Sequence, residues 1–549
     1  MSTIAEEQKP ASIITPEETR GDLFITADVV VVGSGAGGAT MAATLAEAGL
    51  RVVVLEEGAW YPTREYTANI PAMMGRLMRA GGGTAMMGRS PVPYLEGMCV
   101  GGTTVVNGGM CWRTPEKVLD EWARGLPELS PLGLEEHFTE VETTIHARYQ
   151  DDGSQGGVND AFKRGADALG WKLSRNKRNQ KHCVGSNDCV TGCPSGAKQS
   201  TQYSWLPRAF AAGALLYTHC KVEKVLQTGG RATGVTGVLK DPWKPRRFTV
   251  QARAVVLACG AIQTPLLLQR NKIGKACGHV GRHFTIHPNI KLSARFPTPV
   301  DNLQGTHQAW QCVEFRDEGI LLAPGAIPLG FMSAIFPDFG PKLAERMRYA
   351  RYIATGGILV DDHSEGRVRL LPFGVPWIEY NVTEADQAKF IRAAALLAEL
   401  YFTAGAEEVY TPFHHFPVIS SLDDIKNLYR QPPRVEDTEY FTAHIMGTCR
   451  MHPHPKGGVV DADGQTWDLP GLYIADASVM PGTIGVNPQV TIMALAHLIA
   501  VKLADRLKVS GAGRMSEGGG RAPHLPYFAQ HPQPSSFLPC SAYGNRQGP

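Results

Sequence analysis

Buried-strand and helix patterns alternate near the amino terminus. Residues 27–32 read ADVVVV and residues 51–56 read RVVVLE, which are continuous runs rich in β-branched side chains. Such runs are typical of parallel strands that are covered on both faces. Between them, residues 39–48 (ATMAATLAEA) are rich in helix formers, and Gly49 favours the end of that helix. The pattern predicts a strand–helix–strand unit, and therefore a doubly wound, Rossmann-like α/β sheet.

Later segments extend this domain and make it discontinuous. Strand-like runs near residues 221–226 and 254–258 and an apolar-periodic helix after Thr491 are expected to belong to the same sheet domain. We assign three ranges to it: 27–115, 201–289 and 440–509.

The rest of the chain lacks a nucleotide pattern. Residues 116–200 and 290–439 carry amphipathic and aromatic segments, and we assign them to a mixed α+β cap that contacts the substrate. Residues 1–26 are expected to be a loose arm. Residues 510–549 are rich in Gly, Pro, Ser and Gln, which is typical of a mobile tail.

A glycine-rich turn joins the first strand to its helix. Gly33, Gly35 and Gly38 fit the pattern G-x-G-x-x-G. The first glycine permits a tight turn, the second lets the backbone approach a pyrophosphate, and the third lets the helix pack closely on the strand. Glu56, at the end of the second strand, is placed to accept a hydrogen bond from a ribose hydroxyl. The turn predicts a dinucleotide site without distinguishing NAD from FAD.

Charge and hydropathy narrow the class of protein. The formal net charge of +2 is spread without long runs of one sign, so no nucleic-acid surface is expected. No stretch approaches the roughly 18–20 consecutive apolar residues of a membrane-spanning helix, and residues 1–26 lack an apolar signal core. We expect no intrinsic membrane segment. The default location is cytoplasmic, and a periplasmic or membrane-associated location through a partner subunit stays open.

Three cysteines crowd into one loop. Cys183, Cys189 and Cys193 form the pattern C-x5-C-x3-C-P among glycines and small polar residues. Three thiolates followed by a proline fit a three-iron [3Fe-4S] cluster, which is our first interpretation. Zinc would require His182 as a fourth ligand, and a metal-free structural loop is the other alternative.

Four further motifs occur in a fixed order along the chain. They are GGTTVVNG at 101–108, HIMGTCRM at 444–451, GLYIADASVMP at 471–481 and NPQVT at 487–491. Together with the glycine turn, they resemble the glucose–methanol–choline (GMC) oxidoreductases, a family of FAD enzymes. The resemblance implies that the dinucleotide is FAD.

The resemblance also implies further cofactor-binding residues. Gly102 and Asn107 lie in the second glycine cluster, and Asn107 and Asp476 would line the flavin. Val222 would meet the adenine through its backbone. Two plainer interpretations stay open: Asp476 as a cap on the following turn, and Val222 as a core residue of a strand.

The same resemblance implies a catalytic pair. Oxidation of an alcohol by a flavin requires a base for the hydroxyl proton and a group that orients the oxygen. His444 matches the histidine of the family, and a histidine is largely neutral at working pH. Asn487 matches the second position and could hold the oxygen in line, and the resemblance implies that it also contacts the FAD. We therefore predict that this chain oxidises the CH–OH group of a small-molecule alcohol to a carbonyl.

The remaining histidines lack such a motif. We interpret six of them as structural or loop residues, although His415 could still face the cap: His283, His287, His414, His415, His452 and His454.

The motifs leave the electron acceptor open. The cysteine spacing resembles that of bacterial sugar and gluconate dehydrogenase subunits, which implies a cluster that passes electrons to a cytochrome or another acceptor protein. Residues 196–201 (GAKQST) resemble the loop of long-chain alcohol oxidases, which implies an oxygen-using alcohol or sterol oxidase without a cluster. A third alternative is a non-catalytic flavin-binding subunit, against which the intact His444 and Asn487 argue.

Overall fold

The strand–helix–strand unit expected near the amino terminus is present in the computed structural model. β2 (Leu23–Val32) and β3 (Val52–Leu55) pair in parallel, and α1 (Ala36–Glu47) connects them. β2 begins four residues before the expected start, because it stays paired with β12 (Arg246–Leu257) as far back as Leu23.

The structure describes residues 7–150, 152–241, 244–336 and 338–512. Residues Met1–Ala504 form one compact unit, and those from Asp505 onward belong to a second. The last helix, α13 (Gln489–Ala512), extends into the range expected to be a tail, and residues 513–549 lie outside the described part.

An eight-stranded sheet carries the glycine turn. Its strand order is β1-β9-β3-β2-β12-β11-β10, and β23 pairs with β12 outside this order. β11 pairs with β10 and with β12 in the antiparallel direction, whereas the other pairings are parallel. The strands come from separate parts of the chain, which confirms a discontinuous Rossmann-like domain. The members not yet bounded are β1 (Ile13–Ile14), β9 (Leu215–Tyr217), β10 (Cys220–Thr228), β11 (Arg231–Leu239) and β23 (Leu472–Ile474).

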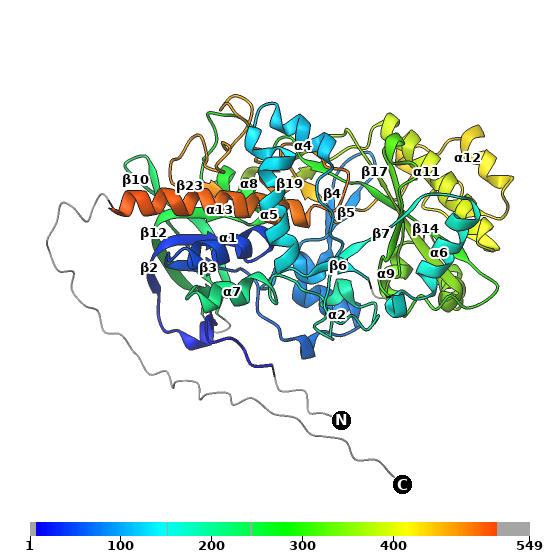
Figure 1. Cartoon of the computed structure of the whole chain (residues 1–549), viewed down its shortest axis with the longest axis horizontal. Coiled ribbons are helices and arrows are strands. Elements are labelled where there is room, and N and C mark those ends of the chain that lie inside the picture. The colour runs from blue at the N-terminus through cyan, green and yellow to red at the C-terminus, as the bar shows by residue number, and fades with distance from the viewer. Residues whose placement is uncertain (1–6, 151, 242–243, 337, 513–549) are drawn as a thin grey trace, which may run out of the picture. The chain divides into compact units, whose positions relative to one another are not determined.

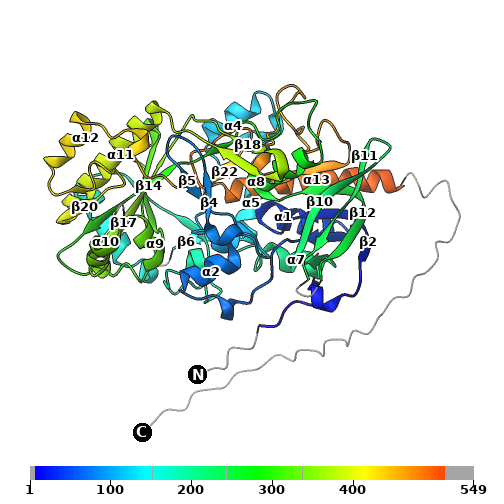
Figure 2. The ribbon, with the colours of Figure 1, turned by 180° about the vertical axis from the view of Figure 1, so that it is seen from behind.

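Two features of this region differ from our expectation. Ile13 in β1 is buried, and β1 pairs with β9, so part of the expected loose arm belongs to the sheet. Helix α5 (Pro131–Thr144), which we assigned to the cap, contacts α7 (Trp205–Ala211) and α13 in addition to its neighbours α4 (Glu116–Ala123) and β6 (Ala147–Tyr149). Glu140 pairs with Arg208 of α7 at 2.6 Å, and the Nδ1 atoms of His137 and His497 lie 2.8 Å apart. Figures 1 and 2 show α1 and α13 side by side along the sheet.

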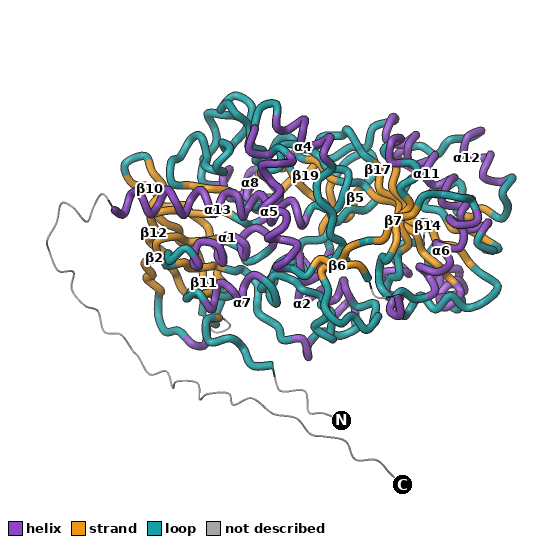
Figure 3. The backbone as a smooth tube through the Cα atoms, viewed as in Figure 1, coloured by secondary structure: helices purple, strands orange, loops and turns teal. Residues whose placement is uncertain are grey.

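A second sheet of seven strands forms the cap, in the order β21-β20-β14-β17-β16-β15-β7. Its pairings are antiparallel. Helices α6 (Gly157–Ala168) and α11 (Glu384–Thr403) pack on each other and on β17, so the cap is α+β as expected. Figure 3 shows the strands gathered in these two groups. The strand bounds are β7 (Leu173–Arg175), β14 (Asn289–Arg295), β15 (Trp310–Cys312), β16 (Ile320–Pro324), β17 (Ile353–Val360), β20 (Glu408–Tyr410) and β21 (Val418–Ile419).

The remaining helices and strands lie outside these two sheets. The helices are α2 (Ile70–Leu77), α3 (Thr103–Val106), α4 (Glu116–Ala123), α8 (Gly260–Arg270), α9 (Leu329–Ala334), α10 (Gly340–Met347) and α12 (Asn427–Arg430). The strands are β4 (Thr84–Met86), β5 (Val92–Tyr94), β6 (Ala147–Tyr149), β8 (Lys177–Asn179), β13 (Thr285–Ile286), β18 (Arg367–Leu370), β19 (Pro376–Glu379) and β22 (Ile445–Met446). Within the described residues, the helices are too short or too polar to span a bilayer.

Candidate active site

A cavity of about 940 Å³ joins the glycine turn to the cap. Its wall includes Gly33, Gly35 and Glu56 from the first sheet domain. The same wall includes His444 and Asn487. The expected nucleotide residues and the expected catalytic pair therefore border one continuous space.

The glycine turn is shaped by close backbone contacts. Gly33 has a φ of +102°, and a Cβ on it would lie 2.4 Å from the carbonyl oxygen of Ala258. A Cβ on Gly38 would lie 2.0 Å from the carbonyl oxygen of Gly33, so α1 packs too close to β2 for a side chain there. A Cβ on Gly102 would lie 2.8 Å from the Cα of Gly35. Backbone alone thus lines the start of α1, which fits the pyrophosphate of FAD.

Glu56 is buried beside this turn. Its Oε2 accepts hydrogen bonds from the backbone N–H of Ser34 at 3.0 Å and from the Ser34 hydroxyl at 2.7 Å. Its Oε1 accepts from the N–H of Gly58 at 2.9 Å. Burial raises the pKa of this carboxyl, while these hydrogen bonds favour its charged form. Because a carboxylate offers about four lone-pair sites and three are used here, Oε1 of Glu56 can still accept a ribose hydroxyl. Val222, on β10, borders the same cavity.

Asn107 and Asp476 also border the cavity. The amide nitrogen of Asn107 donates to Oε1 of Gln489 at 2.7 Å. Asp476 accepts from the N–H of Gly260 at 2.9 Å and from the N–H of Ser478 at 2.8 Å. Asp476 therefore caps the following turn, as the plainer interpretation proposed, while it also forms part of the cavity wall.

His444 and Asn487 lie in contact. Nε2 of His444 is 3.1 Å from Nδ2 of Asn487. Asn487 is held in the turn that precedes α13, and Thr442 fixes His444 by accepting its backbone N–H at 3.0 Å. Burial lowers the pKa of His444 to about 4, and the charge of Lys291 lowers it further in the same direction. His444 is therefore neutral near pH 7, which is the form that accepts a proton.

His287 is part of this site, which corrects our interpretation of it as a structural residue. Its side chain is buried and borders the cavity. Its Nδ1 lies 3.0 Å from Nδ1 of His444, and its Nε2 accepts the backbone N–H of Gly485 at 3.0 Å. His287 is 157 positions from His444 in the chain and lies in none of the motifs, so no local pattern predicts the contact.

These contacts restrict where the ring hydrogens lie. When Gly485 donates to Nε2 of His287, the hydrogen of His287 is on Nδ1 and points to His444. A neutral His444 then carries its hydrogen on Nε2. In the alternative arrangement, His444 donates from Nδ1 to His287, its unprotonated Nε2 accepts from Nδ2 of Asn487, and the bond from Gly485 is lost. A proton can be accepted at Nε2 in the second arrangement alone.

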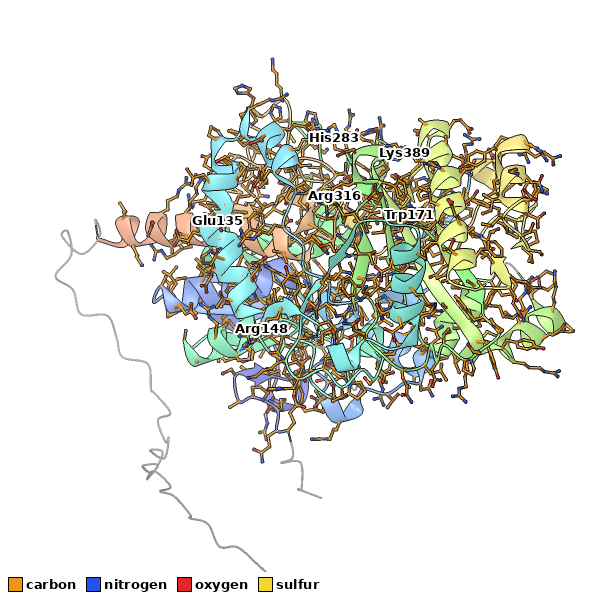
Figure 4. All side chains as sticks on the ribbon, turned by 45° about the vertical axis from the view of Figure 1, so that its right-hand side comes forward. Glu135, Arg148, Trp171, His283, Arg316 and Lys389 are labelled. Atoms are coloured by element: carbon orange, nitrogen blue, oxygen red, sulfur yellow. The ribbon has the colours of Figure 1, made fainter. Side chains whose placement is uncertain are left out.

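The other histidines differ in their relation to the cavity. His283, labelled in Figure 4, bonds to Glu365 at 3.2 Å and to His279 at 3.0 Å. His414 borders the cavity and lies 3.7 Å from Glu439, a position we had not expected. His307 and Lys291 also border the cavity, and neither was singled out from the sequence.

The three cysteine thiols of the loop contact separate partners. Sγ of Cys183 lies 3.7 Å from the Thr306 hydroxyl, and Sγ of Cys189 accepts from Arg178 at 3.3 Å. Sγ of Cys193 accepts from the backbone N–H of Lys198 at 3.3 Å. Within the described residues, no three His, Cys, Asp or Glu side chains are placed to hold a metal ion. The expected [3Fe-4S] cluster and its zinc alternative therefore find no support in this geometry.

The comparisons with known proteins agree with the glycine turn and the cavity. Residues 28–64 match an FAD-binding domain model, and residues 74–289 and 362–496 match two GMC oxidoreductase models. The cavity and the turn thus belong to an FAD-binding oxidoreductase. The chain is a member of the GMC oxidoreductase family.

Individual relatives extend over most of the chain. An uncharacterised GMC-type oxidoreductase of Sinorhizobium fredii is 33% identical over 87% of this chain and 95% of its own. A long-chain-alcohol oxidase of Arabidopsis thaliana is 30% identical over 90% of this chain and 69% of its own. The crystal structure of a pyridoxine 4-oxidase from Mesorbium loti shares the fold, with a TM-score of 0.66. The two sequences are 18% identical, and the match covers 86% of this chain and 98% of the other. These likenesses confirm the family but not the finer resemblance to sugar and gluconate dehydrogenase subunits.

Proposed function

We propose that this protein oxidises the CH–OH group of an organic alcohol to a carbonyl, with FAD as its cofactor. The contact between His444 and Asn487 carries the proposal, because it lies on the wall of the cavity that begins at the glycine turn. When bound, FAD supplies the acceptor for the hydride that leaves the alcohol carbon. The family membership supports the same chemistry.

The side chains have separate tasks in this proposal. His444 accepts the hydroxyl proton at Nε2, and Asn487 donates a hydrogen bond to the substrate oxygen. Positioning of this kind contributes several kcal/mol to lowering a barrier, on the order of 100-fold or more in rate. Because Nε2 must carry no hydrogen, the reactive arrangement is the one in which His444 donates from Nδ1 to His287. His287 is then the positioning residue that decides how much of the reactive arrangement is present.

Our proposal for the identity of the electron acceptor rests on other observations. A long-chain-alcohol oxidase is among the relatives, and the described residues offer no group that could hold a metal ion, so our proposal contains no iron–sulfur relay. The second candidate is a dehydrogenase that passes electrons to a cytochrome or another protein, which the spacing of the cysteines favours. A 24% identical relative, the 2-methyl-1,2-propanediol dehydrogenase of Mycolicibacterium austroafricanum, supports that candidate.

A visible spectrum separates the two candidates. We expect flavin bands alone, the same in Cys189→Ser as in the unchanged protein. Broad additional absorption that disappears in Cys189→Ser would overturn the proposal in favour of the relay.

A substrate screen tests the proposed reaction itself. Sugars, sterols, and aliphatic and aromatic alcohols would be mixed with the FAD-loaded protein without oxygen, and bleaching of the flavin would be recorded. We expect at least one class of alcohol to bleach the flavin and to yield the matching carbonyl. Bleaching by none of them would contradict the proposal.

A further inference from the structure

An unpaired lysine lies in the cap part of the cavity. Strand β14 presents Asn289 and Lys291 to the same side, because side chains two residues apart in a strand share a face. Both residues border the cavity that His444 also borders. The charge of Lys291 reaches that histidine, since it contributes to lowering the pKa of His444.

The neighbouring strand is shaped to leave room for the lysine head group. Gly357 of β17 stands opposite Lys291 in the register of the two strands. A Cβ on Gly357 would lie 2.4 Å from Nζ of Lys291 and 3.5 Å from Oδ1 of Asn289. The ammonium group and the amide therefore approach one point above this glycine. A side chain at position 357 would occupy that point.

Neither polar group at this point is satisfied by the protein. Nζ of Lys291 forms no hydrogen bond or ion pair with any residue that the structure describes, and its contact is with the face of Phe441, 5.1 Å from the ring centre. Oδ1 of Asn289 is buried and has no hydrogen-bond partner. Buried polar groups without partners are costly, so each one in a folded protein requires an explanation.

None of the carboxylates among the described residues forms an ion pair with Lys291 that would balance this charge. Glu436 and Glu439 also border the cavity, but Glu436 is paired with Arg89 at 2.6 Å, and Glu439 lies 3.7 Å from His414. His307, on the adjacent wall, has a pKa that burial lowers to about 3, so it is neutral. Burial lowers the pKa of Lys291 to about 8, and the ammonium form therefore still prevails at pH 7.

Part of the cavity wall is apolar. It is formed in part by three side chains from the loop before α9, from α9 itself and from β17: Ile327, Phe331 and Leu359. An isolated cation in such a wall is stabilised by an anion that arrives with the ligand, because a charged hydrogen bond in a place shielded from water is strong. The carbon chain of the same ligand would cover the apolar wall.

We propose that Lys291 and Asn289 bind a carboxylate group of the substrate, so that the enzyme acts on hydroxycarboxylic acids. This inference rests on the proposed function, because it assigns the second functional group of the alcohol that His444 deprotonates. The ammonium group pairs with the carboxylate. The amide of Asn289 turns its nitrogen to the cavity and donates a second hydrogen bond.

The test compares two substrates and two lysine variants. ω-Hydroxycarboxylates of increasing chain length and the n-alkanols of equal length are mixed without oxygen with the FAD-loaded protein, and kcat/KM is obtained with an artificial electron acceptor. Lys291→Met removes the charge and keeps the length of the side chain. Lys117→Met is the matched control, because Lys117 is exposed on α4.

We expect the unchanged protein to prefer a hydroxycarboxylate to its n-alkanol. We expect Lys291→Met to lower the ratio of kcat/KM for the acid to kcat/KM for the alkanol by about 30-fold or more, as for other truncated buried charge pairs. Lys117→Met should keep both values. An equal loss for both substrates in Lys291→Met, or a preference of the unchanged protein for the alkanol, would overturn the inference.

A binding measurement makes the result independent of turnover. An alkanoate without a hydroxyl is titrated into the FAD-loaded protein, and the shift of the flavin spectrum is recorded. We expect saturable binding that Lys291→Met weakens, and no such difference would count against the carboxylate site. Failure of every alcohol to bleach the flavin would instead refute the proposed function, so the two failures are distinguishable.

Discussion

The Nδ1 atoms of His287 and His444 lie 3.0 Å apart, and one hydrogen lies between them. The ring that carries this hydrogen determines whether Nε2 of His444 is protonated. The backbone N–H of Gly485 bonds to the far nitrogen of His287 at 3.0 Å and thereby favours the hydrogen on His287. The proton-accepting form of His444 therefore competes with the hydrogen bond that the backbone N–H of Gly485 donates to His287. Gly485 lies 198 positions after His287 in the chain.

Replacing His287 with Asn tests this competition. Asn places an amide oxygen near the position of the former Nδ1, where it accepts the hydrogen of His444 and leaves Nε2 free. We expect His287→Asn to retain rapid bleaching of the flavin by substrate. His287→Leu removes the partner altogether and should slow bleaching by about tenfold or more. Equal rates in the two variants, measured by rapid mixing without oxygen, would show that this contact does not control the site.

The pH dependence of flavin bleaching follows from the pKa of His444. Burial lowers this pKa to about 4, and Lys291 and the buried His287 are the titratable groups beside it. Because the neutral ring is the base, activity is present above this pKa and is lost as pH falls through about 4. We expect a flat rate near neutral pH for an n-alkanol, measured while far-UV circular dichroism confirms that the protein stays folded. The ordinary pKa of histidine is about 6.5. A rate that falls to half its maximum near that pH would contradict the buried site.

Asn487 should affect the chemical step more than the binding of FAD. Asn487→Ala removes the amide that orients the oxygen, and the loss of one such donor costs on the order of 100-fold in kcat. Asn487→Asp keeps the size but replaces the donor with a carboxylate, and we expect a similar loss. Bound FAD, measured from the ratio of flavin to protein absorbance, should stay unchanged in both variants. A kcat that survives in Asn487→Ala would remove this residue from the mechanism.

The close packing at Gly38 gives a stability prediction. A methyl group there would lie 2.0 Å from the carbonyl oxygen of Gly33, so Gly38→Ala forces α1 away from β2. We expect the free energy of unfolding to fall by about 1–3 kcal/mol and FAD to be bound more weakly. Gly75→Ala is the matched control, because no atom lies within 4 Å of a Cβ at that position in α2. Denaturant titrations that place both variants at the same stability would contradict this packing.

The sequence predicted the elements whose signals are local. The β-branched runs at 27–32 and 51–56 specify buried strands by themselves, and the glycine turn between them requires little context. The start of β2 at Leu23 and the inclusion of Ile13 in the sheet depend on pairing with distant strands, which no local pattern records. The contacts of α5 with the first sheet domain have the same cause, because its partners Arg208 and His497 are far away in the chain.

The site shows the same division. His444 and Asn487 lie in motifs and could be named from the sequence, whereas His287 and Lys291 have ordinary neighbours and reach the cavity through the fold. The cysteine loop shows the opposite relation between sequence and structure. Its spacing is typical of a cluster, yet each thiol has its own partner in the structure, since spacing along a loop does not fix where the side chains point.

His444→Ala provides the most direct test of the proposed reaction, with His415→Ala as the control. His415 is exposed and pairs with Asp437 at 3.2 Å. Both variants would be loaded with FAD and mixed without oxygen with the best alcohol from the screen, and bleaching of the flavin would be followed. We expect His415→Ala to match the unchanged protein and His444→Ala to keep its FAD but react about 100- to 10,000-fold more slowly. Bleaching at the full rate in His444→Ala would contradict the account.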